Sequence, residues 1–442
     1  MSGKKKPLIL SLMHYPTGHH VAAWRDPATS PEANITLSHY IDSARAAEAA
    51  GFDIAFFPDR LGIPEGPLEA TRRVDEWSHG FEALTLATAV AASTERIGIV
   101  ATASTTFNEP YLLARQLASI DLISGGRVGW NIVTSSLSSE ATNFNATEFR
   151  HDARYERAEE FIQAALKLWQ SWDPKRFPRD KESGVFFEAD ALRPAEFQGK
   201  YFRSLGALNV FPSPQGHPVL VQAGASSAGR DLAARYASLV FTAAPDLSIA
   251  QAYRSDLLAR REKAGRHADP LLVLPGIFPV IGSTEAEAKA KFEALQERVS
   301  PQVALALLGS YLGDIDLSDV DPDGPLPELP PSNSIASRQT LLQELAEREN
   351  LNVLQLARRI AGARGHWQIA GTPEHIADRM VEWYERGGAD GFMLLPPTLP
   401  EGLDLFISEV VPLLRKRGLL NPLDFQGTLH QRLGLPHPVN TL

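Results

Sequence analysis

Short apolar segments alternate with longer amphipathic segments along most of the chain. Eight apolar runs have the length of a buried strand, and they cover residues 8–13, 54–58, 97–101, 128–133, 219–223, 239–242, 271–281 and 391–395. Strands of a parallel sheet are buried on both faces, so they form nearly continuous apolar runs. The pattern therefore predicts eight parallel strands.

A helical pattern follows each predicted strand. The predicted helices cover residues 35–50, 81–92, 110–123, 154–172, 228–236, 247–264, 284–298 and 403–416. In the first, apolar residues recur at helical spacing between Leu37 and Ala47, and Gly51 ends the helix. Eight consecutive βα units predict an α/β protein with a (β/α)8 TIM barrel. A doubly wound open sheet is the alternative, although such sheets usually have fewer strands.

Two stretches interrupt this alternation, after the fourth and the seventh predicted strand. Residues 173–216 are rich in proline, charged and aromatic residues, and residues 300–350 include the acidic, proline-rich segment DIDLSDVDPDGPLPELPPSNS. Because the βα loops of a barrel surround its catalytic end, we interpret both stretches as lids. A surface excursion or a contact between subunits is the alternative. We expect one domain over residues 1–442 with these two insertions.

Composition narrows the class of protein. The chain has 442 residues, of which 44% are hydrophobic, and its net charge is −10, which argues against nucleic acid as a partner. It has no cysteine, so disulfides, cysteine-metal sites and thiol nucleophiles are excluded. The apolar run after the N-terminal lysines is too short for a signal peptide, and no run approaches the roughly 20 residues that span a bilayer. We expect a cytoplasmic protein with no membrane contact.

Polar residues gather at the ends of the predicted strands. Asp59 ends the second strand, Thr102 follows the third, and Asn131 interrupts the apolar run of the fourth, VGWNIV. A buried amide requires a hydrogen-bond partner. Since the carboxyl ends of barrel strands lie at one end of the barrel, these side chains are expected to surround one ligand.

A segment of small residues, GASSAG, follows the fifth predicted strand and begins a helix. Ser226 and Ser227 lie in this segment, where free backbone N–H groups and hydroxyls could hold a phosphate. The alternative is an ordinary serine N-cap with glycines for tight packing. His151 and Tyr155 lie four residues apart at the start of another predicted helix, so they share one face of it. Their side chains could contact the same ligand. The alternative is an ordinary helix start with charged and capping residues.

Three histidines follow the first predicted strand. They are His14, His19 and His20, but they include no H-x-H pair on a strand and no carboxylate cluster accompanies them. We therefore predict no metal site. The chain also has no Walker A segment and no G-x-G-x-x-G after a strand, so a nicotinamide bound in Rossmann fashion is not expected.

These segments resemble those of a known family. The motifs GHHVAAWRDP, RQLASIDLISGGRVGWNIVTS, HDARYERAEEF, QAGASSAGR and GADGFMLLPP occur in order along the chain. They resemble the bacterial luciferase-like flavin monooxygenases, in the branch of the nitrilotriacetate, EDTA, dibenzothiophene-sulfone and long-chain alkane monooxygenases. The resemblance covers almost the entire chain.

The resemblance implies a TIM barrel that uses reduced FMN from a separate NAD(P)H:flavin reductase, and dioxygen, to oxygenate a small organic substrate. It implies a homodimer or a homotetramer. The flavin contacts that it implies are Asp59, Thr102, Asn131, His151, Tyr155, Ser226 and Ser227. Family members act on aminopolycarboxylates, sulfones, alkanes and S-substituted cysteine derivatives, so the substrate stays open.

A histidine near the flavin could move a proton, since the ordinary pKa of this side chain is near 6.5. Our candidates are His14, His19 and His20, with His20 as the first choice, and His366 as the second choice; packed loop histidines are the alternative. Two other functions on the same fold are a deazaflavin- or flavin-dependent reductase or dehydrogenase and a non-catalytic flavin-binding protein. A barrel hydrolase is a more distant alternative.

Overall fold

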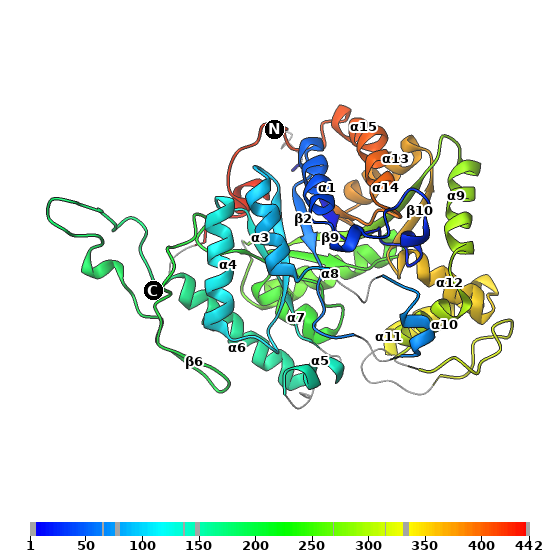
Figure 1. The fold of residues 1–442 in the computed structure, drawn as a ribbon, viewed down its shortest axis with the longest axis horizontal. Coiled ribbons are helices and arrows are strands. Elements are labelled where there is room, and N and C mark those ends of the chain that lie inside the picture. Colours follow the sequence, from blue (N-terminus) through cyan, green and yellow to red (C-terminus); the bar gives the residue numbers. More distant parts are fainter. Residues whose placement is uncertain are drawn as a thin grey trace.

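A closed barrel of eight parallel strands forms the centre of the computed structural model (Figure 1). The structure describes residues 6–63, 66–75, 80–135, 138–145, 151–267, 269–313, 315–329 and 336–438. The barrel strands are β1 (Ile9–Met13), β2 (Ile54–Phe57), β3 (Gly98–Ser104), β4 (Val128–Val133), β7 (Val219–Gln222), β8 (Leu239–Thr242), β9 (Leu272–Ile281) and β11 (Gly391–Leu394). Strand β9 pairs with both β8 and β11, and β11 pairs with β1, which closes the sheet. The predicted TIM barrel is confirmed.

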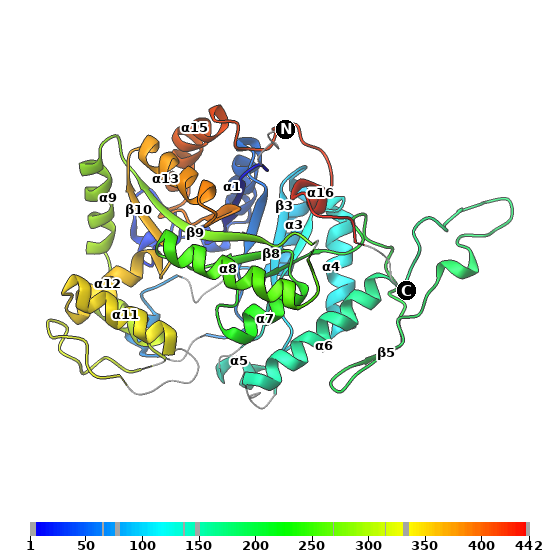
Figure 2. The same ribbon diagram turned by 180° about the vertical axis from the view of Figure 1, so that it is seen from behind.

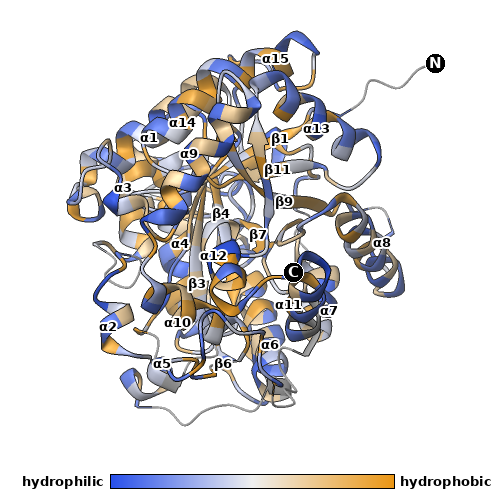
Figure 3. Cartoon of the chain, turned by 90° about the vertical axis from the view of Figure 1, so that its right-hand side faces the viewer, coloured by the Kyte–Doolittle hydropathy of each residue, from blue (hydrophilic) through white to orange (hydrophobic). Residues whose placement is uncertain are grey.

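Helices connect the strands and cover the outside of the barrel (Figures 1 and 2). The predicted ones are α1 (Leu37–Ala50), α3 (Ala83–Ser93), α4 (Pro110–Ser124), α6 (His151–Trp169), α7 (Ser227–Tyr236), α8 (Leu247–Lys263) and α9 (Glu285–Glu297), and the last comprises α14 (Glu401–Leu405), a π-helical turn (Phe406–Val410) and α15 (Val411–Lys416). Helix α4 has Pro110 in its first turn and ends at Gly125, whose φ is 71°. The helices carry both hydrophilic and hydrophobic residues in Figure 3, as amphipathic helices do.

The barrel interior is apolar in its middle and closed at its N-terminal end. Side chains that alternate along the strands, such as Ile9, Phe56 and Val221, form the inner cluster. The short helix α16 (Leu429–Arg432) places Leu429 against Gly98, where a Cβ atom would clash with it. Among the described residues, Leu429 and its neighbours therefore pack into the N-terminal end, and we expect a ligand at the other end.

The second insertion is mainly helical, which the interpretation as a long loop missed. It contains α10 (Pro301–Tyr311) and α11 (Ala336–Glu349), followed by α12 (Val353–Ala363). Their apolar faces form a separate cluster, and Val21 of the loop after β1 belongs to it. The acidic, proline-rich composition of the middle of this stretch obscured the helical periodicity on either side. The structure also contains β10 (Trp367–Gly371), which pairs with β9, and α13 (Pro373–Glu385).

The first insertion lies after β4, as predicted, but beyond α6, in the connection to β7. Its hairpin of β5 (Phe197–Gln198) and β6 (Arg203–Ser204) packs on α6, where Glu160 accepts hydrogen bonds from the backbone N–H groups of residues 200–202. The stretch projects from the barrel on the side opposite α9–α12 in both ribbon views (Figures 1 and 2). This position does not favour the interpretation as a lid.

The other short elements are η1 (Ala23–Arg25), η2 (Ala33–Ile35), α2 (Leu68–Thr71), α5 (Ser138–Asn143) and η3 (Ala189–Ala191). Among the described helices, none is both long enough and apolar enough to cross a membrane.

Candidate active site

Two polar side chains meet inside the barrel near its C-terminal end. Thr102 of β3 pairs with Asn131 of β4. Thr102 lies two residues after Val100 and Asn131 lies two residues after Gly129, and both of these positions face the barrel interior. Because strand side chains alternate, Thr102 and Asn131 face the interior as well. The Nδ2 of Asn131 donates a hydrogen bond to the Oγ1 of Thr102 at 2.9 Å. Its Oδ1 is buried and accepts no hydrogen bond from any described residue.

An unsatisfied buried amide oxygen costs about 1–3 kcal/mol. That cost makes the Oδ1 a candidate to accept a hydrogen bond from a ligand. The predicted pair Thr102 and Asn131 is thus brought together at the expected end of the barrel.

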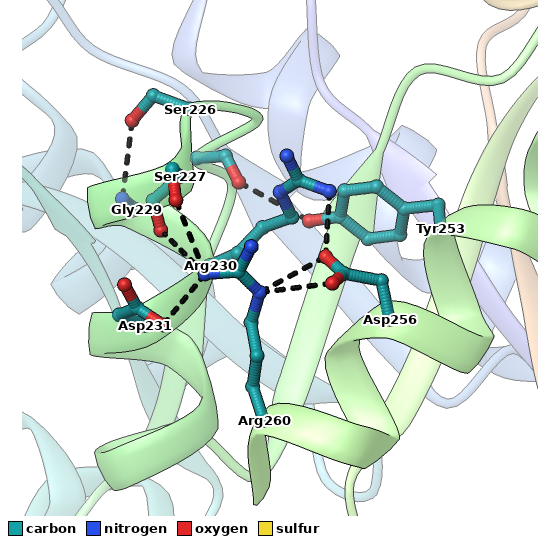
Figure 4. A network of polar contacts seen from close by, with 9 residues as sticks. Ser226, Ser227, Gly229, Arg230, Asp231, Tyr253, Asp256 and Arg260 are labelled. Carbon is teal, nitrogen blue, oxygen red and sulfur yellow. Dashed lines mark hydrogen bonds and ion pairs between the residues drawn. The ribbon is translucent and has the colours of Figure 1, made fainter.

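The segment after β7 forms a second polar group (Figure 4). Ser226 is the N-cap of α7, and its Oγ accepts a hydrogen bond from the N–H of Gly229 at 3.1 Å. The hydroxyl of Tyr155, on α6, lies 3.1 Å from the same Oγ. A Cβ atom at Gly229 would lie 3.1 Å from the Cα of Gly224 and 3.1 Å from the Tyr155 hydroxyl. The glycines therefore allow two chain segments and two hydroxyls to converge at the positive end of a helix, which suits an anion.

Ser227 faces a different set of groups. Its Oγ accepts a hydrogen bond from Arg260 at 3.2 Å, and Arg260 also pairs with Asp231 and Asp256 (Figure 4). Arg230 in turn binds Asp256 at 2.6 Å. The structure therefore joins Ser226 to Tyr155, and it joins Ser227 to a network that fixes α7 against α8.

Asp59 follows β2 as predicted, and its carboxylate binds backbone. Oδ1 accepts a hydrogen bond from the N–H of Arg60 at 2.7 Å, and Oδ2 accepts one from the N–H of Ala83, the first residue of α3, at 3.2 Å. These bonds agree with the alternative that Asp59 caps a loop. His151 is the first residue of α6, and its side chain lies outside the described residues.

His14 presents an unsatisfied nitrogen near the end of β1. Its ring stacks on Phe57 of β2 with centroids 4.9 Å apart, and its buried Nε2 makes no hydrogen bond within the described part of the chain. Burial, together with the nearby His39, lowers the pKa of His14 to about 3. His14 is therefore neutral at physiological pH, and its Nε2 can donate or accept one hydrogen bond.

His20, the first candidate from the sequence, has partners on both sides of its ring. Nδ1 accepts a hydrogen bond from the N–H of Ala22 at 3.1 Å, so Nε2 carries the proton that faces Gln296 Oε1 at 3.4 Å. Burial lowers its pKa to about 3. His20 thus anchors the loop after β1 to α9.

His366 and His19 lie near one another. The ring of His366 stacks on Phe241 of β8 at 5.0 Å, and its centroid lies 5.7 Å from that of His19. Burial lowers the pKa of His19, and the nearby carbonyl of Ala363 acts in the opposite direction. Neither ring nitrogen of His19 forms a hydrogen bond with a described residue.

Ser11 is a polar residue that the sequence prediction omitted. It lies between Ile9 and Met13 on the inward face of β1, and its Oγ is buried without a hydrogen-bond partner among the described residues. The alternation of a strand places residues i and i+2 on one face, so the sequence did contain this signal. The Oγ is a further group that a ligand in the barrel mouth could satisfy.

These residues fit a flavin mononucleotide. The anion site around Ser226 and Tyr155 suits a phosphate, and the unsatisfied Asn131 Oδ1 and His14 Nε2 suit a ring that both donates and accepts hydrogen bonds. Both groups lie at the C-terminal end of the barrel, which is where barrels bind their ligands.

Comparisons with known proteins identify the family of this chain. Residues 15–391 match the family described as Luciferase-like monooxygenase. The N-acetyl-S-(2-succino)cysteine monooxygenase of Bacillus subtilis (strain 168) is 43% identical over 100% of this chain and 99% of its own length. Nitrilotriacetate monooxygenase component A of Aminobacter aminovorans is 42% identical over the same shares of the two chains.

A solved structure of riboflavin lyase with modified FMN and riboflavin has a TM-score of 0.86 and 31% identity, and the match covers 98% of this chain and 97% of the other. The resemblance inferred from the sequence motifs is confirmed. The chain belongs to the luciferase-like monooxygenase family, and it is a flavin-dependent monooxygenase.

Proposed function

We propose that this protein is the large component of a two-component monooxygenase. It takes reduced FMN from a separate flavin reductase and oxygenates a small organic substrate with dioxygen. The observation that carries the proposal is the pair of polar groups at one end of the barrel: the Ser226–Tyr155 hydroxyls at the start of α7 and the unsatisfied Oδ1 of Asn131.

The phosphate of FMN would be held at the start of α7. Ser226 and Tyr155 offer hydroxyl donors, and the free N–H groups of the first helical turn add the positive end of the helix dipole. Arg230 and Arg260 lie nearby, but Asp231 and Asp256 balance their charges, so the helix start and the hydroxyls would have to hold the phosphate. Ser227 would act by keeping α7 in position.

The ring of FMN would lie over the barrel mouth. Reduced FMN, when bound, supplies the electrons that activate dioxygen. Asn131, fixed by Thr102, would orient the ring through its free oxygen, and neutral His14 would hold or accept a proton at Nε2. Apolar neighbours such as Phe57 and Phe241 would exclude water from the reacting atoms. His14 is a better candidate for this role than His20, because both ring nitrogens of His20 already have partners.

The names of the relatives support the partner and the kind of substrate. One relative is designated component A of its monooxygenase, which fits a reductase as a separate protein. The two names also specify N-acetyl-S-(2-succino)cysteine and nitrilotriacetate, both of which are small molecules with several carboxylates. A small acidic compound is therefore a reasonable first substrate to test.

The variant Ser226→Asp tests the phosphate site. Aspartate is also a good N-cap, so α7 should stay intact, but its charge would repel the phosphate. We expect FMN affinity to fall at least about tenfold, with riboflavin affinity unchanged, because riboflavin has no phosphate. The measurement is a fluorescence titration of the purified protein with each flavin, repeated anaerobically with the reduced forms.

Thr372→Asp, at the N-cap of α13, is the matched control and should leave both affinities unchanged. If Ser226→Asp weakens the binding of FMN and of riboflavin equally, or binds FMN with wild-type affinity, this loop does not bind the phosphate. Tighter binding of a deazaflavin than of FMN to the wild type would instead favour a reductase.

A further inference from the structure

Two residues outside the predicted flavin contacts hold the loop between β7 and α7. They are Gln222, the last residue of β7, and Tyr253, in the second turn of α8. Both form hydrogen bonds with the backbone of Gly224, which lies two residues before Ser226. The loop that begins α7 is therefore attached to a barrel strand and to the next helix.

Gly224 is bonded through both of its backbone groups. Its N–H donates a hydrogen bond to the Oε1 of Gln222 at 2.5 Å, and its carbonyl accepts one from the hydroxyl of Tyr253 at 3.1 Å. Figure 4 shows Tyr253 directed from α8 toward the start of α7. Because the N–H and the carbonyl of one residue belong to two successive planar peptide units, these bonds orient both units.

The position of Gly224 also requires the absence of a side chain. A Cβ atom there would lie 2.5 Å from the Nε2 of Gln222 and 3.0 Å from the Cα of Gly229. Gly229 is the residue whose N–H donates to the Oγ of Ser226. The two glycines therefore let the loop lie directly on the first turn of α7, and the two bonds to Gly224 keep it there.

Tyr253 is suited to donate this hydrogen bond. Burial raises the pKa of Tyr253 to about 12, so its hydroxyl keeps its proton at neutral pH. The guanidinium of Arg230, on α7, lies 5.9 Å from the centre of its ring, within the range of a cation–π contact. A phenylalanine in this place would keep the ring and lose only the hydroxyl.

We propose that Gln222 and Tyr253 are positioning residues that give the protein a preference for FMN over riboflavin. Since carboxylates balance the nearby guanidinium groups, a phosphate depends on the first N–H groups of α7 and on the hydroxyls of Ser226 and Tyr155. Such donors bind more tightly when they are fixed beforehand, because the loop then loses no further conformational entropy. This inference rests on the proposed function, since it concerns the FMN site of the same enzyme.

The test is a fluorescence titration of two variants with FMN and with riboflavin, which has no phosphate. Tyr253→Phe should weaken FMN binding roughly fivefold, the loss expected for one neutral hydrogen bond. Gln222→Leu leaves the N–H of Gly224 without its acceptor and should weaken FMN binding roughly tenfold or more. Riboflavin affinity should stay at the wild-type value in both variants.

Tyr384→Phe is the matched control. Tyr384, on α13, also donates its hydroxyl to a backbone carbonyl, that of Lys6. This variant should bind both flavins like the wild type, and the melting temperature of each variant should confirm that it is folded. If Gln222→Leu does not fold, Tyr253→Phe decides the question alone.

Two results would overturn the inference. One is equal weakening of FMN and riboflavin binding in Tyr253→Phe, which a merely structural role predicts, and the other is wild-type FMN affinity in both variants. Ser226→Asp separates this inference from the proposed function. If Ser226→Asp weakens FMN binding and the other two variants do not, only the positioning role is wrong. If Ser226→Asp also binds FMN like the wild type, the proposed function loses its phosphate site.

Discussion

The two ends of the barrel bury polar side chains in opposite ways. At the N-terminal end, Asp53 accepts hydrogen bonds from Arg432 at 2.8 Å, from Asn421 at 3.0 Å and from the N–H of Leu10 at 2.9 Å. At the C-terminal end, Asn131 Oδ1 and His14 Nε2 are buried without a hydrogen bond from a described residue. The first end uses polar groups for stability, and we propose that the second leaves them for a ligand.

Other residues of the N-terminal end follow the same rule. Arg127 donates to the backbone carbonyls of Ala91, Thr94, Ser124 and Ile97 and to the hydroxyl of Thr94. The exceptions are Arg432 Nη1 and His430 Nε2, and both side chains form hydrogen bonds through their other nitrogens. Polar burial alone therefore does not indicate a site, and a buried polar atom without a partner is only a candidate for one.

The largest expected effect comes from Asp53→Ala. The side chains of Asp53 and Arg432 are only 1% and 3% exposed, so the variant leaves a buried charge without its partner. Such a loss costs about 3–5 kcal/mol of the free energy of unfolding. Urea unfolding would measure it, and FMN affinity of the folded protein should stay at the wild-type value.

The double variant Asp53→Leu/Arg432→Met should recover much of this loss, because it removes both charges. A loss below about 1 kcal/mol in Asp53→Ala would contradict the structural role of the N-terminal end.

Asn131→Leu should have the opposite profile. It removes one hydrogen bond to Thr102 but also an unsatisfied oxygen, so the free energy of unfolding should change by no more than about 1 kcal/mol. FMN affinity should fall roughly tenfold or more, because a charged or polar ring group loses its partner. Parallel urea unfolding and FMN titration would measure both quantities. Marked destabilisation with normal FMN affinity would assign Asn131 to the fold instead.

The last expected effect concerns His14 and depends on pH. Its folded-state pKa, about 3, lies below its unfolded value of about 6.5, so only the unfolded chain takes up a proton between these values. The stability that this residue contributes is present above pH 6.5 and is lost as pH falls toward 3, at up to about 1.4 kcal/mol per pH unit. Urea unfolding between pH 7 and pH 5 should therefore show a shallower pH dependence for His14→Gln, by about one proton. Identical slopes for variant and wild type would show that His14 does not stay neutral.

The barrel could be predicted because short continuous apolar runs alternate with segments in which apolar residues recur at helical spacing. The sequence also predicted that Thr102 and Asn131 would lie at the same end of the barrel, and the structure pairs them. The pairing of Tyr155 with Ser226 is a separate contact, and the family resemblance, rather than a local pattern, led to it.

The contacts of the histidines lie beyond the reach of such arguments. The partner of His20 is Gln296, 276 residues away along the chain, and no local pattern records that contact. The choice among the histidines therefore depends on information that only tertiary structure contains, and it stays a prediction. The helices α10 and α11 were missed for a different reason, since the acidic segment between them dominated the composition of the stretch.

The most direct measurement is a crystal structure of the protein with FMN. The account predicts the phosphate within hydrogen-bonding distance of Ser226 Oγ and the Tyr155 hydroxyl, and the ring within hydrogen-bonding distance of Asn131 Oδ1. A flavin bound elsewhere, with Asn131 Oδ1 and His14 Nε2 still without partners, would contradict the claim that the C-terminal end of this barrel keeps its polar groups for FMN.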